Sequence, residues 1–153
     1  MWVTSTAVPD SAPNSAYIPD QDGISDKVLD SRPVTITSAS ALLRFRNNFD
    51  TEFSGGIFWD AGVLEISSPN INGGDFTDIT DPAVGGWFVS GGYNATIGTC
   101  FMSPFPNCPM GWAGNSGGYI TTVANLGSNE RTNHHVALPD ANRRGGRGPR
   151  VVG

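Results

Sequence analysis

Short stretches of alternating apolar and polar residues, separated by turn residues, run through the middle of the chain. Leu43 and Phe45 alternate with Arg44 and Arg46, which places the apolar pair on one face of an extended strand. We expect further strands where apolar runs lie between turn sequences. The expected strands cover residues 34–37, 41–46, 63–67, 76–79, 87–89, 93–97 and 119–123. No segment predicts a helix.

The clearest turn lies between the strands expected at 63–67 and 76–79. Leu64 and Ile66 share one face, and the sequence NINGG over residues 70–74 follows them. Such a sequence is typical of a β-hairpin. Glycines suit its tip because a tight reversal needs positive φ angles. Glycine pairs also stand beside the strands expected later in the chain, at 85–86, 91–92 and 117–118.

Turn signals that recur at intervals of about ten residues predict an all-β fold, an antiparallel two-sheet β-sandwich or jelly roll. The composition agrees, because 20 glycines and 11 prolines in 153 residues disfavour a helical bundle. We expect one domain with three parts. They are a turn-rich entry segment (residues 1–23), a β-sandwich (residues 24–126) and an irregular basic tail (residues 127–153).

The distribution of charge also separates residues 1–126 from residues 127–153. Residues 1–126 hold twelve acidic and four basic groups, whereas residues 127–153 hold two acidic groups and five arginines. An acidic body makes nucleic acid an unfavourable partner. No apolar run is long enough to cross a bilayer. Few lysines, abundant Asn, Gly, Ser and Thr, and the glycosylation triplet at 94–96 favour a secreted, extracellular protein.

Five segments follow one another in a familiar order: ISDKVLDSRPVTI, LLRFRNNFDTE, DAGVLEISSPNINGGDFTDI, GGYNATI and WAGNSGGYITTVANL. Their order resembles the MAM-like jelly-roll β-sandwich that accompanies the catalytic domain in bacterial secreted metalloproteases of the immune inhibitor A type. The resemblance implies a non-catalytic adhesion or binding module of an exported multidomain protein. Its partners would be a protein or polysaccharide surface ligand and the catalytic domain of the parent chain.

The last residues depart from that family pattern, which closes with a further Arg-Phe-Arg strand. Here the chain reads LPDANRRGGRGPRVVG. We hypothesise a frame-shifted reading after Leu126 and a sandwich truncated at both ends. Arg143, Arg144, Arg147 and Arg150 offer an alternative, because RGG-type tails bind nucleic acids.

No catalytic motif accompanies the strands, so we expect no enzymatic activity. His134 and His135 lack further ligands at zinc spacing, and no His-Glu-x-x-His occurs. The turn GNSGG at 114–118 contains a serine but lacks the Gly-x-Ser-x-Gly pattern of a nucleophile elbow.

Two groups of carboxylates predict structural calcium, because calcium prefers oxygen ligands gathered around a turn. The first group lacks the bidentate glutamate of an EF-hand loop, and its alternative is a solvated turn. The second group is expected because jelly-roll domains often hold a structural cation between strand ends. The groups are Asp20, Asp22 and Asp26, and Asp50, Glu52 and Asp60.

Two further features suggest binding or stability outside the cell. Cys100 and Cys108 could close a small loop by a disulfide, the alternative being two buried thiols. Trp59, Trp87 and Trp112 stand next to turns, where a carbohydrate-binding sandwich would place stacking aromatics. Core packing explains such residues equally well.

Overall fold

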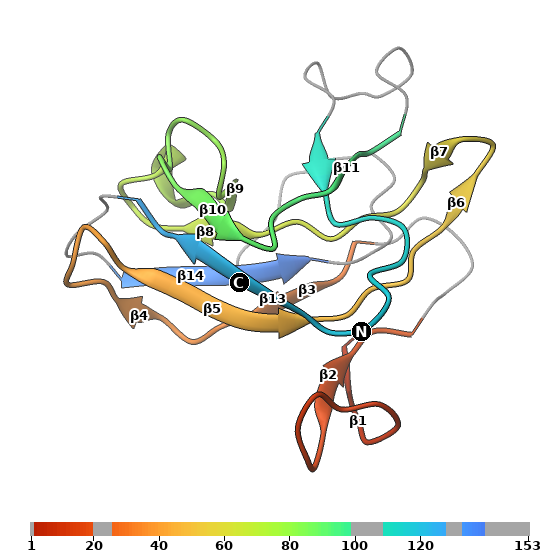
Figure 1. Cartoon of the computed structure of the whole chain (residues 1–153). Helices are drawn as coiled ribbons and strands as arrows, with labels where there is room; N and C mark the ends of the chain where they lie inside the picture. The colour runs from red at the N-terminus through yellow and green to blue at the C-terminus, as the bar shows by residue number, and fades with distance from the viewer. Residues whose placement is uncertain (1, 20–25, 99–108, 128–132, 140–153) are drawn as a thin grey trace.

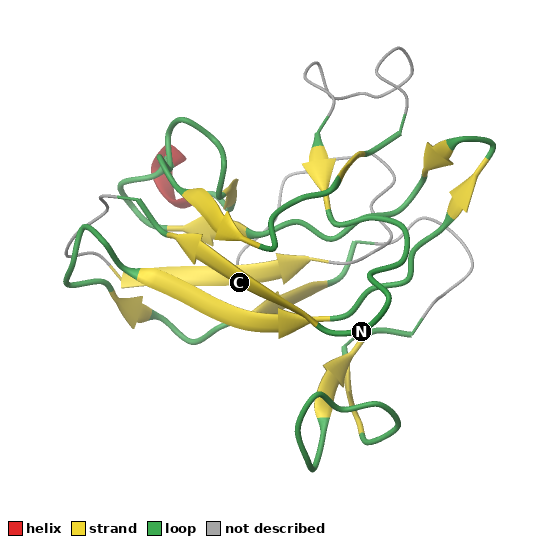
Figure 2. Cartoon of the chain, viewed as in Figure 1, coloured by secondary structure: helices red, strands yellow, loops and turns green. Residues whose placement is uncertain are grey.

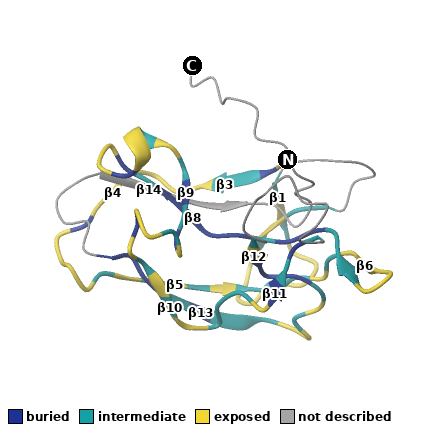
Figure 3. Ribbon diagram, turned by 90° about the horizontal axis from the view of Figure 1, so that it is seen from above, coloured by how far each residue is buried: buried dark blue, intermediate teal, exposed yellow. Residues whose placement is uncertain are grey.

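A computed structural model describes residues 2–19, 26–98, 109–127 and 133–139 of the chain. The described residues form short strands and loops with one short helical turn, Asn72–Gly74 (Figure 2). Two sheets face each other as layers (Figure 3), and every strand pair is antiparallel. The structure thus confirms the predicted all-β antiparallel sandwich, while the jelly-roll connectivity stays a prediction.

The larger sheet has the strand order β3-β14-β8-β9, with β4 also paired to β14. Its strands are β3 (Val28–Asp30), β4 (Val34–Thr35), β8 (Glu65–Ser67), β9 (Thr77–Asp78) and β14 (Asn133–Pro139). The facing sheet has the order β10-β13-β5. Its strands are β10 (Trp87–Ser90), β13 (Ile120–Asn125) and β5 (Leu42–Asn47).

Three two-stranded ribbons extend from these layers (Figure 1). They are β1–β2 (Val3–Ser5 with Ser15–Tyr17), β6–β7 (Phe53–Ser54 with Ile57–Phe58) and β11–β12 (Ala95–Thr96 with Met110–Gly111). The β1–β2 ribbon is followed in the chain by β3, and it lies beside the edge of the sandwich formed by β3 and β5.

The strongest sequence patterns fold as predicted. Exposed and half-buried residues alternate along β5, and Leu43 and Phe45 pack against the core. The hairpin also forms, with Ile66 of β8 opposite Thr77 of β9. Gly73 and Gly74 at its tip have φ angles of 71° and 102°, which residues with a Cβ atom rarely adopt.

Two expectations need correction. The turn-rich entry segment contains the β1–β2 ribbon, and the tail is not irregular throughout because Asn133–Pro139 forms β14. β14 lies between β3 and β8 and pairs with both. β3 lies roughly a hundred residues before β14 in the chain. Local sequence patterns therefore do not reveal the register of β14.

An apolar core fills the space between the layers. Its buried residues are Ile36, Leu64, Ile66, Ile71, Ile79, Val84, Trp112, Ala124 and Leu126. Trp112 is only 3% exposed and makes edge-to-face contacts with Phe45, Phe88 and Tyr93, at centroid distances of 5.8, 5.4 and 5.0 Å. Core aromatic packing therefore occupies most of the Trp112 ring, and ligand stacking on it stays a prediction.

Gly91 holds the Trp112 indole in place. Its carbonyl accepts hydrogen bonds from Trp112 Nε1 (2.9 Å) and from Thr122 Oγ1 (2.8 Å). Gly91 has a φ angle of 62°, and a Cβ atom there would collide with the backbone carbonyl of Thr121. Only glycine fits this position without displacing β13.

Tyr93 fastens the hairpin to the aromatic core. Its hydroxyl donates to Asp78 Oδ2 (2.7 Å) and accepts from the backbone N–H of Leu64 (2.8 Å). Burial, followed by the nearby carboxylate of Asp78, raises the pKa of Tyr93 well above its ordinary value of 10.0.

Replacing Tyr93 with phenylalanine tests this contact. The variant Tyr93→Phe leaves the Leu64 N–H and Asp78 without their shared partner, so we expect the free energy of unfolding to fall by about 1–3 kcal/mol. Urea denaturation measures it. Tyr17→Phe is the matched control, because Tyr17 is 50% exposed and its loss should change stability by less than about 0.5 kcal/mol. Equal effects of the two variants would contradict the assignment.

The raised pKa of Tyr93 also predicts a pH dependence. The unfolded chain releases this proton near pH 10.0 while the native protein retains it. The native state therefore loses stability as pH rises above the unfolded pKa and up to the native one. Between pH 8 and about pH 11, urea denaturation should show a larger loss for the natural chain than for Tyr93→Phe. The same loss in both proteins would assign the titration to other groups.

Candidate functional site

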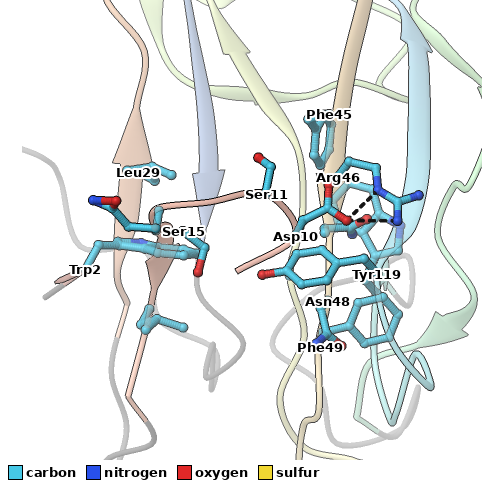
Figure 4. Close-up of a pocket in the computed structure, with 16 residues that line it drawn as sticks. Trp2, Asp10, Ser11, Ser15, Leu29, Phe45, Arg46, Asn48, Phe49 and Tyr119 are labelled. Atoms are coloured by element: carbon cyan, nitrogen blue, oxygen red, sulfur yellow. Dashed lines mark hydrogen bonds and ion pairs between the residues drawn. The ribbon is translucent and has the colours of Figure 1, made fainter. Parts of the chain in front are cut away.

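A cleft of about 400 Å³ opens where the N-terminal ribbon meets the edge strands β3 and β5 (Figure 4). We call it the lateral cleft. It is lined by residues of the segments 2–18 and 45–49, together with Leu29, Gly62, Trp112 and Tyr119. Its volume lies within the range of about 300–1,000 Å³ that is typical of small-molecule sites.

Aromatic and aliphatic side chains form both walls of the lateral cleft. Trp2 and Leu29 stand on one side, and Phe49 and Tyr119 stand on the other (Figure 4). The core residue Trp112 also reaches the cleft. A ligand can therefore contact apolar surface on two sides while its remaining groups meet polar atoms.

The wall made by the N-terminal segment is fastened to the sandwich by polar contacts. Arg46 Nε and Nη2 donate to Asp10 Oδ1 (3.1 and 3.0 Å), and Arg46 Nη1 donates to Thr121 Oγ1 (2.8 Å). The Tyr119 hydroxyl donates to the backbone carbonyl of Val8 (2.9 Å). These contacts join the loop between β1 and β2 to β5 and β13. They also pair Arg46 with Asp10, the two charged residues among the described lining residues.

The turn at 114–118 positions the opposite wall. The Ser116 hydroxyl donates to Asn48 Oδ1 (2.8 Å) and accepts from the backbone N–H of Phe49 (3.0 Å). The Ser116 N–H in turn donates to the Phe49 carbonyl (2.9 Å). Ser116 therefore has a structural part in the fold: it fixes Asn48 and Phe49 at the mouth of the cleft.

The polar groups of the lateral cleft are mainly neutral. Ser11, Asn14, Ser15 and Asn48 contribute hydroxyls and amides, which both donate and accept hydrogen bonds. The Trp2 indole nitrogen is buried and has no hydrogen-bond acceptor among the described residues. Among the described lining residues none is His, Cys, Lys or Glu. These lining residues can form hydrogen bonds and apolar contacts with a ligand.

Asp50, Glu52 and Asp60, the second group predicted to bind calcium, are not gathered into one site. Within the ranges that the structure describes, no group of three or more His, Cys, Asp or Glu side chains is placed to hold a metal ion. Asp50 and Glu52 are exposed, whereas Asp60 is buried at 6% exposure, so these three do not form the expected cluster. Asp26 is exposed.

Several other predicted sites lie outside the described residues. Calcium binding at Asp20 and Asp22, the disulfide between Cys100 and Cys108, and the nucleic-acid function of the arginines at 143–150 all stay predictions. For His134 and His135 the structure describes the backbone of β14 only.

The two remaining tryptophan candidates lie apart from the lateral cleft. Trp59 is half-buried, and its Nε1 donates to the Ser54 carbonyl (3.2 Å) of the preceding ribbon. Trp87 is 53% exposed on β10, opposite Asn125 of β13. Trp87 thus keeps a face free for contact on the outer surface of its sheet. The Asn94 amide of the glycosylation triplet has a structural use, since it donates to the Ala113 carbonyl (2.8 Å).

Sequence reasoning missed the residues that build the cleft, namely Trp2, Phe49 and Tyr119. Trp2 stands in a polar, proline-rich segment, and nothing local indicates that it lines a cleft together with Leu29 of β3. The one available signal was an isolated large aromatic residue in a segment otherwise read as surface connection.

No family model matches the chain, and no curated protein or solved structure matches it either. In the part of the chain that the structure describes, no helix has the length and apolar character needed to span a membrane. The lateral cleft is therefore the feature that points to a function.

The docking of the N-terminal segment can be tested at its ion pair. Asp10→Asn removes a partly exposed pair, which should contribute no more than about 1 kcal/mol. We expect amide hydrogen exchange in β1 and β2 to rise by about two- to fivefold, because a two-stranded ribbon is marginally stable once undocked. Asp75→Asn, at an exposed turn position, is the charge-matched control. Unchanged exchange in Asp10→Asn would show that the ion pair does not hold the ribbon.

Proposed function

We propose that the chain is a non-catalytic binding module that holds its ligand in the lateral cleft. The observation that carries this proposal is the mixed lining of the cleft. Aromatic residues face each other across it, at Trp2 and Tyr119, and neutral hydroxyl and amide groups lie between them. Concave sites with apolar walls and a few convergent polar groups are typical ligand sites.

The polar contacts of the cleft favour binding over catalysis. Asp10 and Arg46 are engaged with each other, and the Ser116 hydroxyl beside the cleft is engaged with Asn48 and Phe49. An acyl-transfer or hydrolytic mechanism needs a nucleophile within reach of a base. The described lining residues offer no such pair.

The setting we propose comes from the sequence resemblance over residues 24–126. It is a secreted multidomain bacterial protein in which this module serves adhesion or ligand binding beside a metalloprotease catalytic domain. The acidic charge of residues 1–126 supports a protein or polysaccharide ligand over nucleic acid. Because fold alone does not fix function, the cleft is the part of the proposal to test first.

Small neutral probes can locate the binding surface without a known ligand. We expect indole, phenol and benzamide, each titrated into the isotope-labelled full chain, to shift NMR resonances around Trp2, Ser15, Asn48 and Tyr119. The exposed Trp87 provides an internal control on a different face. Shifts that gather around Trp87, or that spread evenly over the chain, would contradict the assignment of the lateral cleft.

A further inference from the structure

We propose that the lateral cleft binds a neutral oligosaccharide, with one sugar ring lying against the indole of Trp2. This inference rests on the proposed binding function and names its ligand class. Three observations on the cleft lead to it: its internal charge balance, the kind of polar groups that it presents, and the position of Trp2 beside two adjacent hollows.

The charge balance favours a neutral ligand. Arg46 uses Nε, Nη1 and Nη2 on Asp10 and Thr121. The two opposite charges lie 3.0 Å apart and offset each other, so a charged ligand gains less from either group than it would from an unpaired charge. A charged ligand therefore gains little from Asp10 and Arg46, the two charged side chains among the described lining residues.

The polar groups match the hydroxyls of a sugar. Ser11 and Ser15 have hydroxyls, and Asn14 and Asn48 have amides. Each of these groups can donate a hydrogen bond to a sugar hydroxyl and accept one from it. An apolar ligand would leave these groups unpaired on burial, which is unfavourable. A sugar ring satisfies them at its edge and presents C–H groups on its face.

Trp2 supplies the surface for that face. Aromatic rings carry a negative potential on their faces, to which polarised C–H groups are attracted. The Trp2 Nε1 is buried, so the ring is the part of Trp2 that lines the cleft. Trp2 thus supplies an apolar plane in the wall.

A second hollow beside the lateral cleft gives room for a ligand longer than one sugar ring. It has a volume of about 360 Å³ and shares Trp2, Asn14, Ser15 and Leu29 with the lateral cleft. Trp2 therefore borders both spaces, the lateral cleft and an open groove beside β1. A linear chain of sugars can pass this residue with one unit in each space.

Titration of the full chain with defined oligosaccharides tests the inference. The probes are the neutral trimers of glucose (β-1,4 and α-1,4 linked), xylose and N-acetylglucosamine, with trigalacturonate as the anionic comparison and a capped neutral tetrapeptide as the protein-like comparison. We expect at least one neutral trimer to shift the Trp2 indole N–H resonance, with a dissociation constant between about 0.1 and 10 mM. The anionic trimer and the tetrapeptide should bind more weakly.

Matched variants locate the contact. Trp2→Ala should weaken binding of the neutral trimer by about tenfold or more. Trp2→Phe keeps an aromatic plane but has no N–H. Its affinity for the neutral trimer should fall between those of the natural chain and Trp2→Ala. Trp87→Ala, on the outer sheet face, should leave the affinity within about twofold. Retained dispersion of the remaining amide resonances shows that each variant is folded.

The outcomes separate this inference from the proposed function. If the small neutral probes occupy the cleft but no neutral trimer binds below about 10 mM, the cleft is a ligand site and the carbohydrate assignment falls. Tighter binding of trigalacturonate or of the tetrapeptide overturns it equally. If neither the small probes nor the sugars bind, both proposals fall. Neutral-trimer binding lost in Trp87→Ala but kept in Trp2→Ala places the sugar on another face and overturns the assignment to Trp2.

Discussion

The packing of the Trp112 indole between the two sheets is the contact on which the rest of the structure depends. Its ring meets Phe45 of β5, Phe88 of β10 and Tyr93 before β11, so one side chain joins segments spread over most of the described chain. Its N–H is satisfied by Gly91, which removes the cost of burying a donor. Losing a core tryptophan typically costs about 3–5 kcal/mol, a large part of the stability of a domain of this size.

The same residue connects the core to the candidate site. Trp112 and Phe45 reach the inner end of the lateral cleft, and Tyr93 carries the packing on to the β8–β9 hairpin through Asp78 and Leu64. The floor of the cleft is therefore rigid core, whereas one wall is a ribbon held by an ion pair and a few hydrogen bonds. A rigid floor with a less firmly held wall suits a site that must select and then release a ligand.

The parts predicted correctly from sequence are those with strong local signals. Alternation in β5 and the glycines of the β8–β9 turn depend on neighbouring residues alone, because period-two alternation and positive φ angles are local properties. The strands β1 and β14 could not be predicted, since their pairing partners supply what their own sequences lack. Proximity to a turn selected Trp112, which is buried, and passed over Trp2, which lines the lateral cleft together with Leu29.

The docking of the N-terminal segment across the edges of the sandwich creates the lateral cleft. Nuclear Overhauser measurements on the full chain test it most directly. The account predicts cross-peaks between the Tyr119 ring and Val8, and between the side chains of Asp10 and Arg46, which are joined here by hydrogen bonds of 2.9 and 3.0 Å. Their absence in a folded sample, with the β5–β13 cross-peaks intact, would show a sandwich without the cleft and would contradict the account.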